Sequence, residues 1–594
     1  TCHATPKAVL HESAQEHSCS TASSVSEAEG TASTRLTTCF PAFSFAMWKM
    51  KVRFAYEFAK YCTCMKYPIG IQTFDRIRED GYVYVDKTRL IYSMTHEGTV
   101  YFLSRPRRFG KSLLLSTLKN YFLGRRELFE GLEISKLEKE WKTYPVFHVD
   151  FGLGNYARTD SLDNVLNSYI SEWERTYHVA HPAPTHEYSL RFHDVLKAAH
   201  AATGLRAVVL IDEYDKPLLD ILDSGITLER SGERITLEEY NRELLRTLYT
   251  TFKAADEYLQ FVMLTGVTKF SQVSVFSGFN QPNDISMDAR YDTLCGITEE
   301  EIDHYFQEPV AEMARMDGCT EEEEREALRR RFNGYHFSNR LRGVYNPFSL
   351  LNSLQKLDIQ DYWFRTGTPT YLVRLLGHFN ENINELTGKY YAANQFMDYR
   401  ADVEKPLPMI FQSGYLTIKN YDRGTNTFLI DFPNDEVKRG FITLLTSSYL
   451  NAKDNVESWM ATAVVALKRG ELEQFRQMLA SFLSSIPYTM HRKDNEREKE
   501  RYFHYTFYLL LRLMSTYLVC TEKAQSQGRV DCIIETKLHI YIFEFKLDGS
   551  ASEALKQIEE KGYAREFACD QRQIHKIGCS FSSASGTIEE WQVE

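Results

Sequence analysis

The sequence predicts an α/β protein with a parallel sheet, a helical middle region and a second, smaller α/β segment at the C-terminus. Three observations support this prediction. Between residues 67 and 300, short apolar runs alternate with longer helical stretches. Residues 301–490 are mainly helical and rich in acidic side chains, and a last strand-and-helix pattern follows residue 500. Apolar strands separated by helices are typical of a parallel sheet with both faces covered.

The composition is that of an ordinary globular protein. The chain has 594 residues, of which 43% are hydrophobic and 25% are charged, so a sizeable core is expected. The net charge of -11 argues against a protein that coats nucleic acid non-specifically, although local basic patches stay open. No apolar run approaches the ~18 residues needed to cross a bilayer, so we expect no membrane partner.

Cysteine placement favours a reducing compartment. Five of the 11 cysteines crowd into the first 64 residues, and the other six are scattered without a CxxC pair. Reduced thiols, and therefore a cytoplasmic location, are the better interpretation.

Residues 1–65 form a leader without helical or strand periodicity. The chain begins at Thr1, and the first strongly patterned segment follows Met65. The leader lacks the charged start and long apolar centre of a secretory signal. Two explanations stay open: a disordered tail, or a non-native extension with natural translation starting at Met65.

Residues 66–300 are predicted to hold the parallel sheet. Four short, mainly apolar runs are predicted to be buried strands: Val100–Ser104, Val146–Phe151, Ala207–Ile211 and Phe261–Thr265. Helices are expected between them, including Ser112–Phe122 and Tyr188–Ala202.

A phosphate-binding loop is predicted between the first strand and the helix after it, in FLSRPRRFGKSLLLSTL. Gly110 lets the backbone approach a phosphate, Lys111 reaches the β- and γ-phosphates, and Ser112 ligates Mg²⁺. Arg105 stands where the general pattern has its first glycine, so a chance match to a basic turn is the alternative. The predicted ATP-binding residues of the loop are Arg108, Phe109, Gly110, Lys111, Ser112 and Leu113.

The segment AVVLIDEYDKP supports the prediction of a phosphate-binding loop. Asp212 and Glu213 end a buried strand, and ligands bind at the carboxyl ends of parallel strands. Asp212 is predicted to hold Mg²⁺ and Glu213 to polarise an attacking water; a solvated acidic turn is the alternative. Thr265, or Thr268, could report the γ-phosphate from a neighbouring strand, although a threonine at a strand end is usually a turn residue.

The middle region, residues 301–490, is expected to be a helical lid with a short β element near 411–432. FQSGYLTIKNYD and FLIDFPNDEV predict two strands joined by a turn.

A second constellation lies in GRVDCIIETKLHIYIFEFK, residues 528–546. Asp531 lies in one predicted strand, and Glu544 and Lys546 lie in the next. Because side chains alternate along a strand, Glu544 and Lys546 share a face with Ile540 and Ile542, and both faces are largely apolar. Burying these charges is costly without a partner or a metal. We therefore predict that Asp531 and Glu544 bind Mg²⁺ and Lys546 activates water; a buried Glu–Lys pair with Asp531 in a turn is the alternative.

At this point a resemblance is clear. SRPRRFGKSLLLSTL, LIDEYDKP, LTGVTKFS, NGYHF…VYNPFSLL, YWFRTGTPTYL and FQSGYLTIKNYD…FPNDEV resemble the AAA-ATPase-like family of bacterial proteins, from about residue 66 to 590. Family members carry Arg at the position of Arg105, and they usually end in a PD-(D/E)XK nuclease-like domain. The resemblance implies a P-loop NTPase domain over 66–300 and a nuclease-like domain over 500–594. Gln557 and Tyr563 match the QxxxxxY element of many such nuclease domains.

These features together imply a cytoplasmic, Mg²⁺-dependent ATPase whose nucleotide state controls a nuclease-like domain acting on DNA or RNA. A nucleotide-dependent switch or scaffold without nuclease activity is the alternative from another class. A degenerate nuclease fold that only binds DNA is a third, although the presence of Asp531, Glu544 and Lys546 argues against it. No basic groove is evident in the C-terminal segment, and an oligomer stays open.

Overall fold

The computed structural model describes most of the chain after residue 64. The described residues are 65–179, 186–230, 232–270, 282–364, 386–398, 406–449, 456–484, 519–521, 524–525, 528–529, 532–582, 585 and 587–594. The predicted leader therefore lies outside them, apart from Met65.

A five-stranded parallel sheet forms the first part of the fold. Its order is β2 (Val146–Asp150), β3 (Ala207–Asp212), β6 (Leu259–Gly266), β1 (Val100–Ser104) and β7 (Asn283–Asp284). The parallel sheet and its four predicted strands are confirmed, with bounds that shift by at most two residues. The later strand β6 is inserted between β1 and β3, which brings Thr265 opposite Leu103 and Leu264 opposite Ile211.

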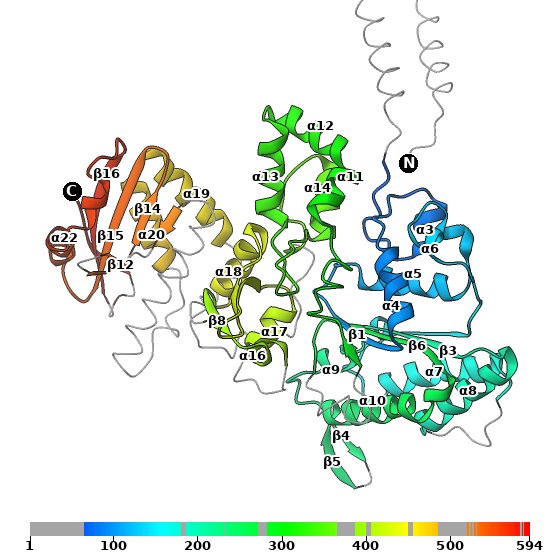
Figure 1. Cartoon of the computed structure of the whole chain (residues 1–594). Helices are drawn as coiled ribbons and strands as arrows, with labels where there is room; N and C mark the ends of the chain where they lie inside the picture. Colours follow the sequence, from blue (N-terminus) through cyan, green and yellow to red (C-terminus); the bar gives the residue numbers. More distant parts are fainter. Residues whose placement is uncertain are drawn as a thin grey trace, which may run out of the picture. The chain divides into compact units, whose positions relative to one another are not determined.

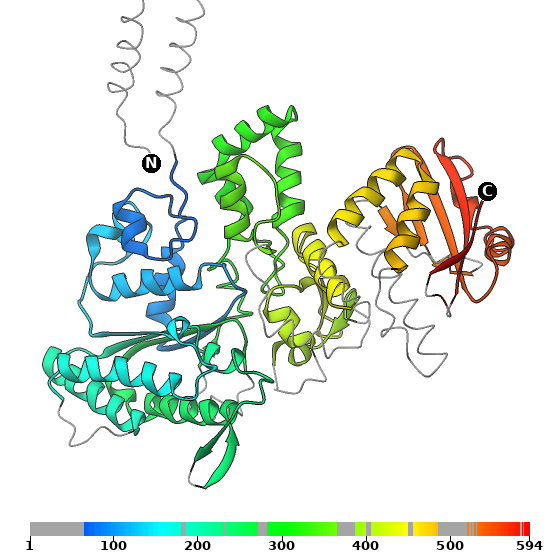
Figure 2. The same cartoon turned by 180° about the vertical axis from the view of Figure 1, so that it is seen from behind.

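Helices cover both faces of this sheet (Figure 1). On one side lie α4 (Thr88–Glu97) and α5 (Lys111–Phe122), and on the other lie α7 (Ser161–Thr176), α8 (Tyr188–Thr203) and α10 (Leu237–Ala254). All six residues of β3 are buried, as its apolar sequence requires of a strand covered on both faces. The hairpin of β4 (Thr227–Arg230) and β5 (Glu233–Thr236) projects beyond α10 (Figure 2). The smaller elements here are α3 (Phe74–Glu79), η1 (Arg126–Phe129), α6 (Ile134–Leu137), η2 (Phe151–Leu153), α9 (Lys216–Leu219) and η3 (Asp256–Tyr258).

The acidic stretches of the middle region are helix N-termini. Thr298 and Glu301 form a capping box at the start of α11, and Thr320 and Glu323 form another at the start of α13. In each box the threonine hydroxyl accepts a hydrogen bond from the backbone N–H of the glutamate, and the glutamate carboxylate accepts one from the backbone N–H of the threonine. The negative charge of the glutamates also interacts favourably with the helix dipole. The helices are α11 (Glu299–Tyr305), α12 (Gln307–Asp317), α13 (Glu321–Phe332) and α14 (Pro347–Lys356).

The predicted two-stranded element is part of a three-stranded antiparallel sheet. Its order is β8 (Lys389–Tyr391), β10 (Thr427–Asp431) and β9 (Thr417–Asp422). The helices around and after it are α16 (Ala393–Met397), α17 (Leu407–Gln412), α18 (Asp435–Tyr449), α19 (Val456–Arg469) and α20 (Leu472–Ser484).

The C-terminal sheet has the order β11 (Val519–Thr521), β14 (Cys532–Glu535), β15 (His539–Leu547), β16 (Gln573–Phe581) and β17 (Ile588–Val593). Strand β15 is central, antiparallel to β14 and parallel to β16. A short hairpin of β12 (Ala524–Gln525) and β13 (Gly528–Arg529) precedes β14, and α22 (Ala551–Glu560) and η7 (Tyr563–Phe567) lie between β15 and β16.

The two faces of β15 pack as the alternation predicts. Ile540 and Ile542 share a buried cluster with Leu555 of α22, whereas Tyr541 and Phe543 lie in a cluster that includes Phe475 of α20. The prediction of a central strand buried on both faces is confirmed. No helix within the described ranges is both long enough and apolar enough to cross a membrane.

Candidate functional site

The loop after β1 turns through two left-handed residues. Arg108 has φ 66° and Gly110 has φ 92°, and α5 begins at the next residue. No neighbouring atom lies within 4 Å of the point that a Cβ of Gly110 would occupy. This open space, at the N-terminus of a helix with its unpaired backbone N–H groups, suits a phosphate group.

The side chain of Lys111 is buried and points back into the loop between β1 and α5. Its Nζ donates to the backbone oxygens of Arg105 at 2.9 Å and Pro106 at 3.1 Å. Burial lowers the pKa of Lys111, while the nearby carboxylates of Asp212 and Glu213 oppose that shift. The ammonium is thus positioned inside the loop, where a bound phosphate would compete for it with the loop carbonyls.

The β6 insertion decides how Asp212 is oriented. Thr265 Oγ1 donates to Asp212 Oδ1 at 2.6 Å, and the backbone N–H of Glu213 donates to the same oxygen at 3.0 Å. Thr265 is completely buried and does not line the cavity described below. Its role as a γ-phosphate sensor stays a prediction. In the structure, Thr265 holds the carboxylate of Asp212 in place.

Glu213 follows Asp212 in a left-handed conformation, with φ 49°. Its side chain lines the same cavity as Lys111 and Ser112. Burial raises the pKa of Glu213, and the positive charges of Lys111 and Arg107 partly offset the shift. A carboxylate in this position can accept a hydrogen bond from a water beside a bound nucleotide.

The residues after Glu213 brace the end of β6. Asp215 accepts hydrogen bonds from the backbone N–H groups of Val267 at 3.0 Å and Thr268 at 2.6 Å, and burial raises its pKa to about 6. A Cβ on Gly266 would lie 2.6 Å from Asp215 Oδ1, so the contact requires glycine there. We did not predict this bracing from the sequence, although DEYD and TGVT carry the residues for it.

The loop opens into a cavity of about 540 Å³. Arg108, Gly110, Lys111, Ser112 and Leu113 line it together with Glu213, so most of the predicted residues meet there. Its other walls come from distant segments that the sequence did not assign to the site: Pro68–Gln72, Pro347, Phe348, Leu351, Trp363, Phe364, Ser413 and Tyr415. Their motifs, YPIGIQ, NPFSLL and FQSGY, contain little acid–base or charge chemistry that could have identified them.

Phe109 lies outside the cavity lining. Its ring packs edge-on against Tyr335, with centroids 4.8 Å apart, and against Phe337 at 5.6 Å. Its side chain anchors the loop to the NGYHF segment, and its predicted contact with ATP would therefore use the backbone.

Arg105 is a buried structural residue. Its guanidinium donates to Ser104 O at 2.9 Å and Ser286 O at 2.8 Å and lies 4.0 Å from the centroid of Phe337. Its side chain is 1% exposed, and burial lowers its pKa to about 10. The arginine that replaces the first loop glycine thus points into the protein rather than into the cavity.

Ser112 and Asp212 fit a magnesium site of the kind completed by phosphates. Ser112 contributes a hydroxyl in the first turn of α5, and both hydrogen bonds named above reach Oδ1 of Asp212, so its Oδ2 can face a metal or a metal-bound water. Mg²⁺ often takes only one or two protein oxygens and completes its shell with water and phosphate. Across the described ranges, no three His, Cys, Asp or Glu side chains converge as a metal site.

The second site centres on the buried carboxylate of Glu544. Gln557 Nε2 donates to Glu544 Oε1, and Lys546 Nζ donates to Gln557 Oε1 at 2.6 Å and to Glu544 Oε1 at 3.5 Å. Three predicted residues, Glu544, Lys546 and Gln557, are thus brought together across β15 and α22. Asp531, the other predicted metal ligand and catalytic carboxylate, lies outside the described residues.

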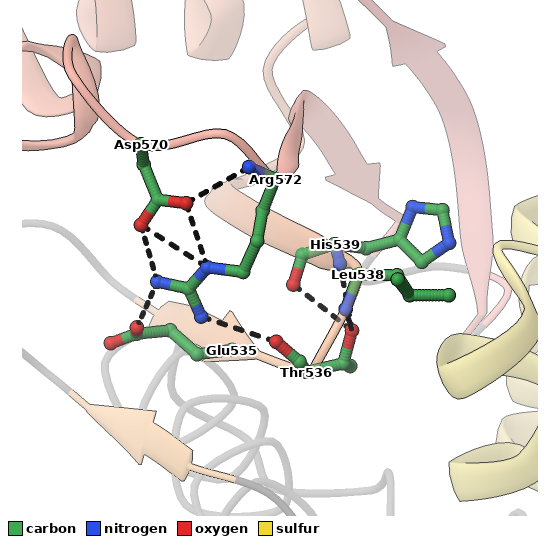
Figure 3. Close-up of polar contacts among 6 residues, drawn as sticks. All are labelled: Glu535, Thr536, Leu538, His539, Asp570 and Arg572. Carbon is green, nitrogen blue, oxygen red and sulfur yellow. Dashed lines mark hydrogen bonds and ion pairs between the residues drawn. The ribbon is translucent and has the colours of Figure 1, made fainter.

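An ion-pair cluster around Arg572 lies between the end of β14 and the start of β16 (Figure 3). Arg572 donates to Asp570 at 2.6 Å, to Glu535 at 2.8 Å and to the backbone oxygen of Thr536 at 3.1 Å. Hydrogen bonds from Arg572 lower the pKa of Asp570 to about 2. The cluster ties the β14–β15 turn to the start of β16, so its positive charge is used within the fold.

The three consecutive arginines in the last turn of α13, the helix that directly precedes the NGYHF segment, are also paired. Arg329 bonds to Glu299, Arg330 lies 3.2 Å from Asp435, and Arg331 pairs with Asp361. These pairs favour a structural role over contact with a nucleic-acid backbone.

The chain matches models of known protein families and a relative of similar length. The model of predicted AAA-ATPases matches residues 68–276, and that of the PD-(D/E)XK nuclease superfamily matches residues 498–591. The chain is 36% identical over 542 residues to the "Uncharacterized protein in vnfD 5′ region" of Azotobacter chroococcum mcd 1, covering 89% of this chain and 99% of that protein. The two family models coincide with the two sites described above.

Proposed function

Because the chain belongs to the predicted AAA-ATPase family and carries a PD-(D/E)XK nuclease superfamily domain, we propose that it is a Mg²⁺-dependent ATPase whose nucleotide state controls the C-terminal domain. We place this activity in the bacterial cytoplasm, in keeping with the free thiols of Cys295, Cys319, Cys569 and Cys579. The observation that carries the proposal is the convergence of Lys111, Ser112 and Glu213 on one cavity, beside Asp212.

Each residue then has a defined role. Lys111 and the backbone N–H groups at the start of α5 bind the phosphates, and Thr265 holds Asp212 in position. Ser112 and Asp212 would hold Mg²⁺, which when bound neutralises charge on the β- and γ-phosphates. Glu213 orients the attacking water and accepts its hydrogen bond. The water oxygen bonds to the γ-phosphorus as the bond to the β,γ-bridging oxygen breaks, giving ADP and phosphate.

Glu213→Gln tests this assignment. The amide keeps the size of the side chain but is a poor base, so the variant should bind ATP and fail to hydrolyse it. Single-turnover hydrolysis and retention of radiolabelled ATP measure the two effects. Glu233→Gln, on the exposed strand β5, is the matched control and should hydrolyse ATP normally. Unchanged hydrolysis by Glu213→Gln would remove Glu213 as the base.

For the C-terminal domain we propose metal-dependent cleavage of DNA or RNA, with Asp531 and Glu544 as metal ligands and Lys546 acting on the water. The contact of Glu544 with both Lys546 and Gln557 supports a prepared site. Glu544→Ala and Lys546→Ala should each abolish cleavage of single- or double-stranded substrates with Mg²⁺ or Mn²⁺. Lys556→Ala, exposed on the neighbouring helix, should leave it intact.

A nucleotide-dependent switch or scaffold without nuclease activity is the second candidate. It is favoured by the ion pairs of Arg572 with Asp570 and Glu535, which use that positive charge within the fold instead of leaving it for a nucleic-acid backbone. If wild-type protein turns over ATP and cleaves none of these polymers, this second function stands.

A further inference from the structure

We propose that Arg107 contacts the γ-phosphate during hydrolysis and serves as the protein's own arginine finger, supplied by the phosphate loop itself. The inference rests on the proposed ATPase function and adds the group that stabilises the transition state. Arg107 lines the cavity with Lys111, Ser112 and Glu213.

Arg107 lines the same cavity as Glu213, and its positive charge acts on that carboxyl group. Burial raises the pKa of Glu213, and the guanidinium of Arg107, after Lys111, is among the positive charges that lower it. The side chain of Arg107 is exposed toward the cavity, and Trp363 fixes the backbone beneath it, because its Nε1 donates to Arg107 O at 3.1 Å. A fixed backbone and a long cationic side chain on the cavity wall together suit a contact with a bound nucleotide.

The other cations near the site have different roles. Arg105 is buried against Phe337, and Arg108 lies 4.0 Å from the ring centroid of Phe348. Lys216 lines the cavity, but its Nζ is held by Asp220 at 2.6 Å. Among the described residues that line the cavity, the arginines are Arg107 and Arg108.

Arg290 is also excluded on geometry. It bonds to Asp288 and to Glu97 and does not line the cavity. It therefore provides a control that removes an exposed arginine without touching the site.

The chemistry explains why a cation is needed. As the γ-phosphoryl group leaves the β,γ-bridging oxygen for the water oxygen, negative charge spreads over its equatorial oxygens and the bridging oxygen. A planar guanidinium can donate two hydrogen bonds to such oxygens. Because these bonds are strongest in the transition state, Arg107 should affect kcat far more than KM.

The test uses the full chain in wild-type, Arg107→Ala, Arg107→Lys and Arg290→Ala forms. Steady-state hydrolysis gives kcat and KM for ATP, and equilibrium titration compares ADP alone with ADP plus Mg²⁺ and fluoroaluminate, which imitates the transition state. We expect Arg107→Ala to lose about a thousandfold in kcat with KM nearly unchanged. It should bind ADP normally but lose the tight fluoroaluminate complex. Arg107→Lys should recover part of both, and Arg290→Ala should match wild type.

The outcomes separate this inference from the function on which it rests. If wild type hydrolyses ATP and Arg107→Ala does so at the same rate, the inference is overturned and the ATPase assignment remains. Loss of kcat in Arg108→Ala but not in Arg107→Ala overturns it as well, because the neighbouring arginine would then have the role. If wild type neither binds nor hydrolyses ATP, both proposals fail. Because Arg107 is exposed, thermal unfolding of Arg107→Ala should match wild type, which identifies any loss of activity as local.

Discussion

Three arginines follow β1 within four positions, and their environments differ. Arg105 bonds to backbone oxygens inside the protein, Arg107 lines the cavity, and Arg108 stacks on Phe348 in a left-handed conformation. A replaced loop glycine would suggest a damaged site if the loop were compared with the general pattern alone. The contacts show instead that Arg105 joins the loop to the segment around Ser286 and to Phe337.

Restoring the general glycine should therefore weaken the protein. We expect Arg105→Gly to lower the free energy of unfolding by roughly 3–5 kcal/mol, because buried carbonyl partners lose a charged donor. Urea unfolding followed by fluorescence measures the change. Arg108→Gly is the control: relief of its left-handed φ offsets the lost contact with Phe348, so stability should change by about 1 kcal/mol or less. A fully stable Arg105→Gly would contradict the anchoring role.

At the scale of single elements, β6 decides the orientation of Asp212, the proposed metal ligand. A strand that comes later in the chain enters between β1 and β3, and its Thr265 meets Asp212. Groups that orient a metal ligand usually affect metal affinity strongly even though they do not touch the metal.

Thr265→Val keeps the shape of this buried side chain and removes its donor. We expect the Mg²⁺ concentration needed for half-maximal ATP hydrolysis to rise about 10–100-fold. Thr250→Val, exposed on α10, should leave the requirement unchanged. If the two variants behave alike, Thr265 does not position Asp212.

Helix α18 begins with a second buried carboxylate. Glu436 accepts hydrogen bonds from Ser349 Oγ and from the backbone N–H of Trp363, each at 2.7 Å. Burial raises the pKa of Glu436 to about 7. The cavity wall at Trp363 is thus joined to the N-terminus of α18 through one carboxylate.

This carboxylate should make stability depend on pH. Between about pH 4 and about pH 7 the folded state binds more protons at Glu436 than the unfolded state, whose glutamate has a pKa of about 4.3. The free energy of unfolding should therefore fall as pH rises across that range, by roughly 3 kcal/mol for this group. Glu436→Gln should flatten the decrease when unfolding is measured across those pH values, and the exposed Glu233→Gln should retain it. An identical slope in all three proteins would contradict the buried titration.

At the scale of the whole molecule, α18 and the two helices after it link the core clusters. Val437 and Phe441 of α18 lie in the core cluster of the first part, whereas Ile442 lies in the cluster of the C-terminal sheet. Helices α19 and α20 belong to that second cluster, and Tyr541 Oη donates to Leu467 O at 2.6 Å. Part of the expected middle region thus covers one face of the nuclease-like sheet.

A C-terminal fragment should therefore need α19 and α20. A fragment of residues 450–594 should unfold cooperatively, whereas one of residues 500–594 should expose the apolar face of β15 and aggregate. Circular dichroism and size-exclusion chromatography compare the two. A monomeric, cooperatively folded 500–594 fragment would place the boundary at residue 500.

The sequence identified residues that the fold brings together at both candidate sites, but not the segments that surround them. The loop residues, the carboxylates at the end of β3 and the Glu544–Lys546 pair were identifiable because each set lies in or next to one element, whereas Gln557 of α22 was identified by its match to the QxxxxxY element. Phe109 and Thr265 were assigned to nucleotide, yet neither side chain lines the cavity. Their burial depends on neighbours far along the chain, which local spacing does not reveal.

What the sequence determined by itself is the identity of most elements and of the candidate side chains at their ends. Apolar runs set the strands, and glycine, lysine and carboxylates at their ends set the candidate chemistry. The tertiary structure decided the strand order that brings Thr265 to Asp212, the distant walls of the cavity, and the separation of Arg105 from Arg107. Those features depend on burying apolar surface between segments that lie up to about 350 positions apart, such as Pro68 and Tyr415, and such packing is decided by the whole fold and not by local pattern.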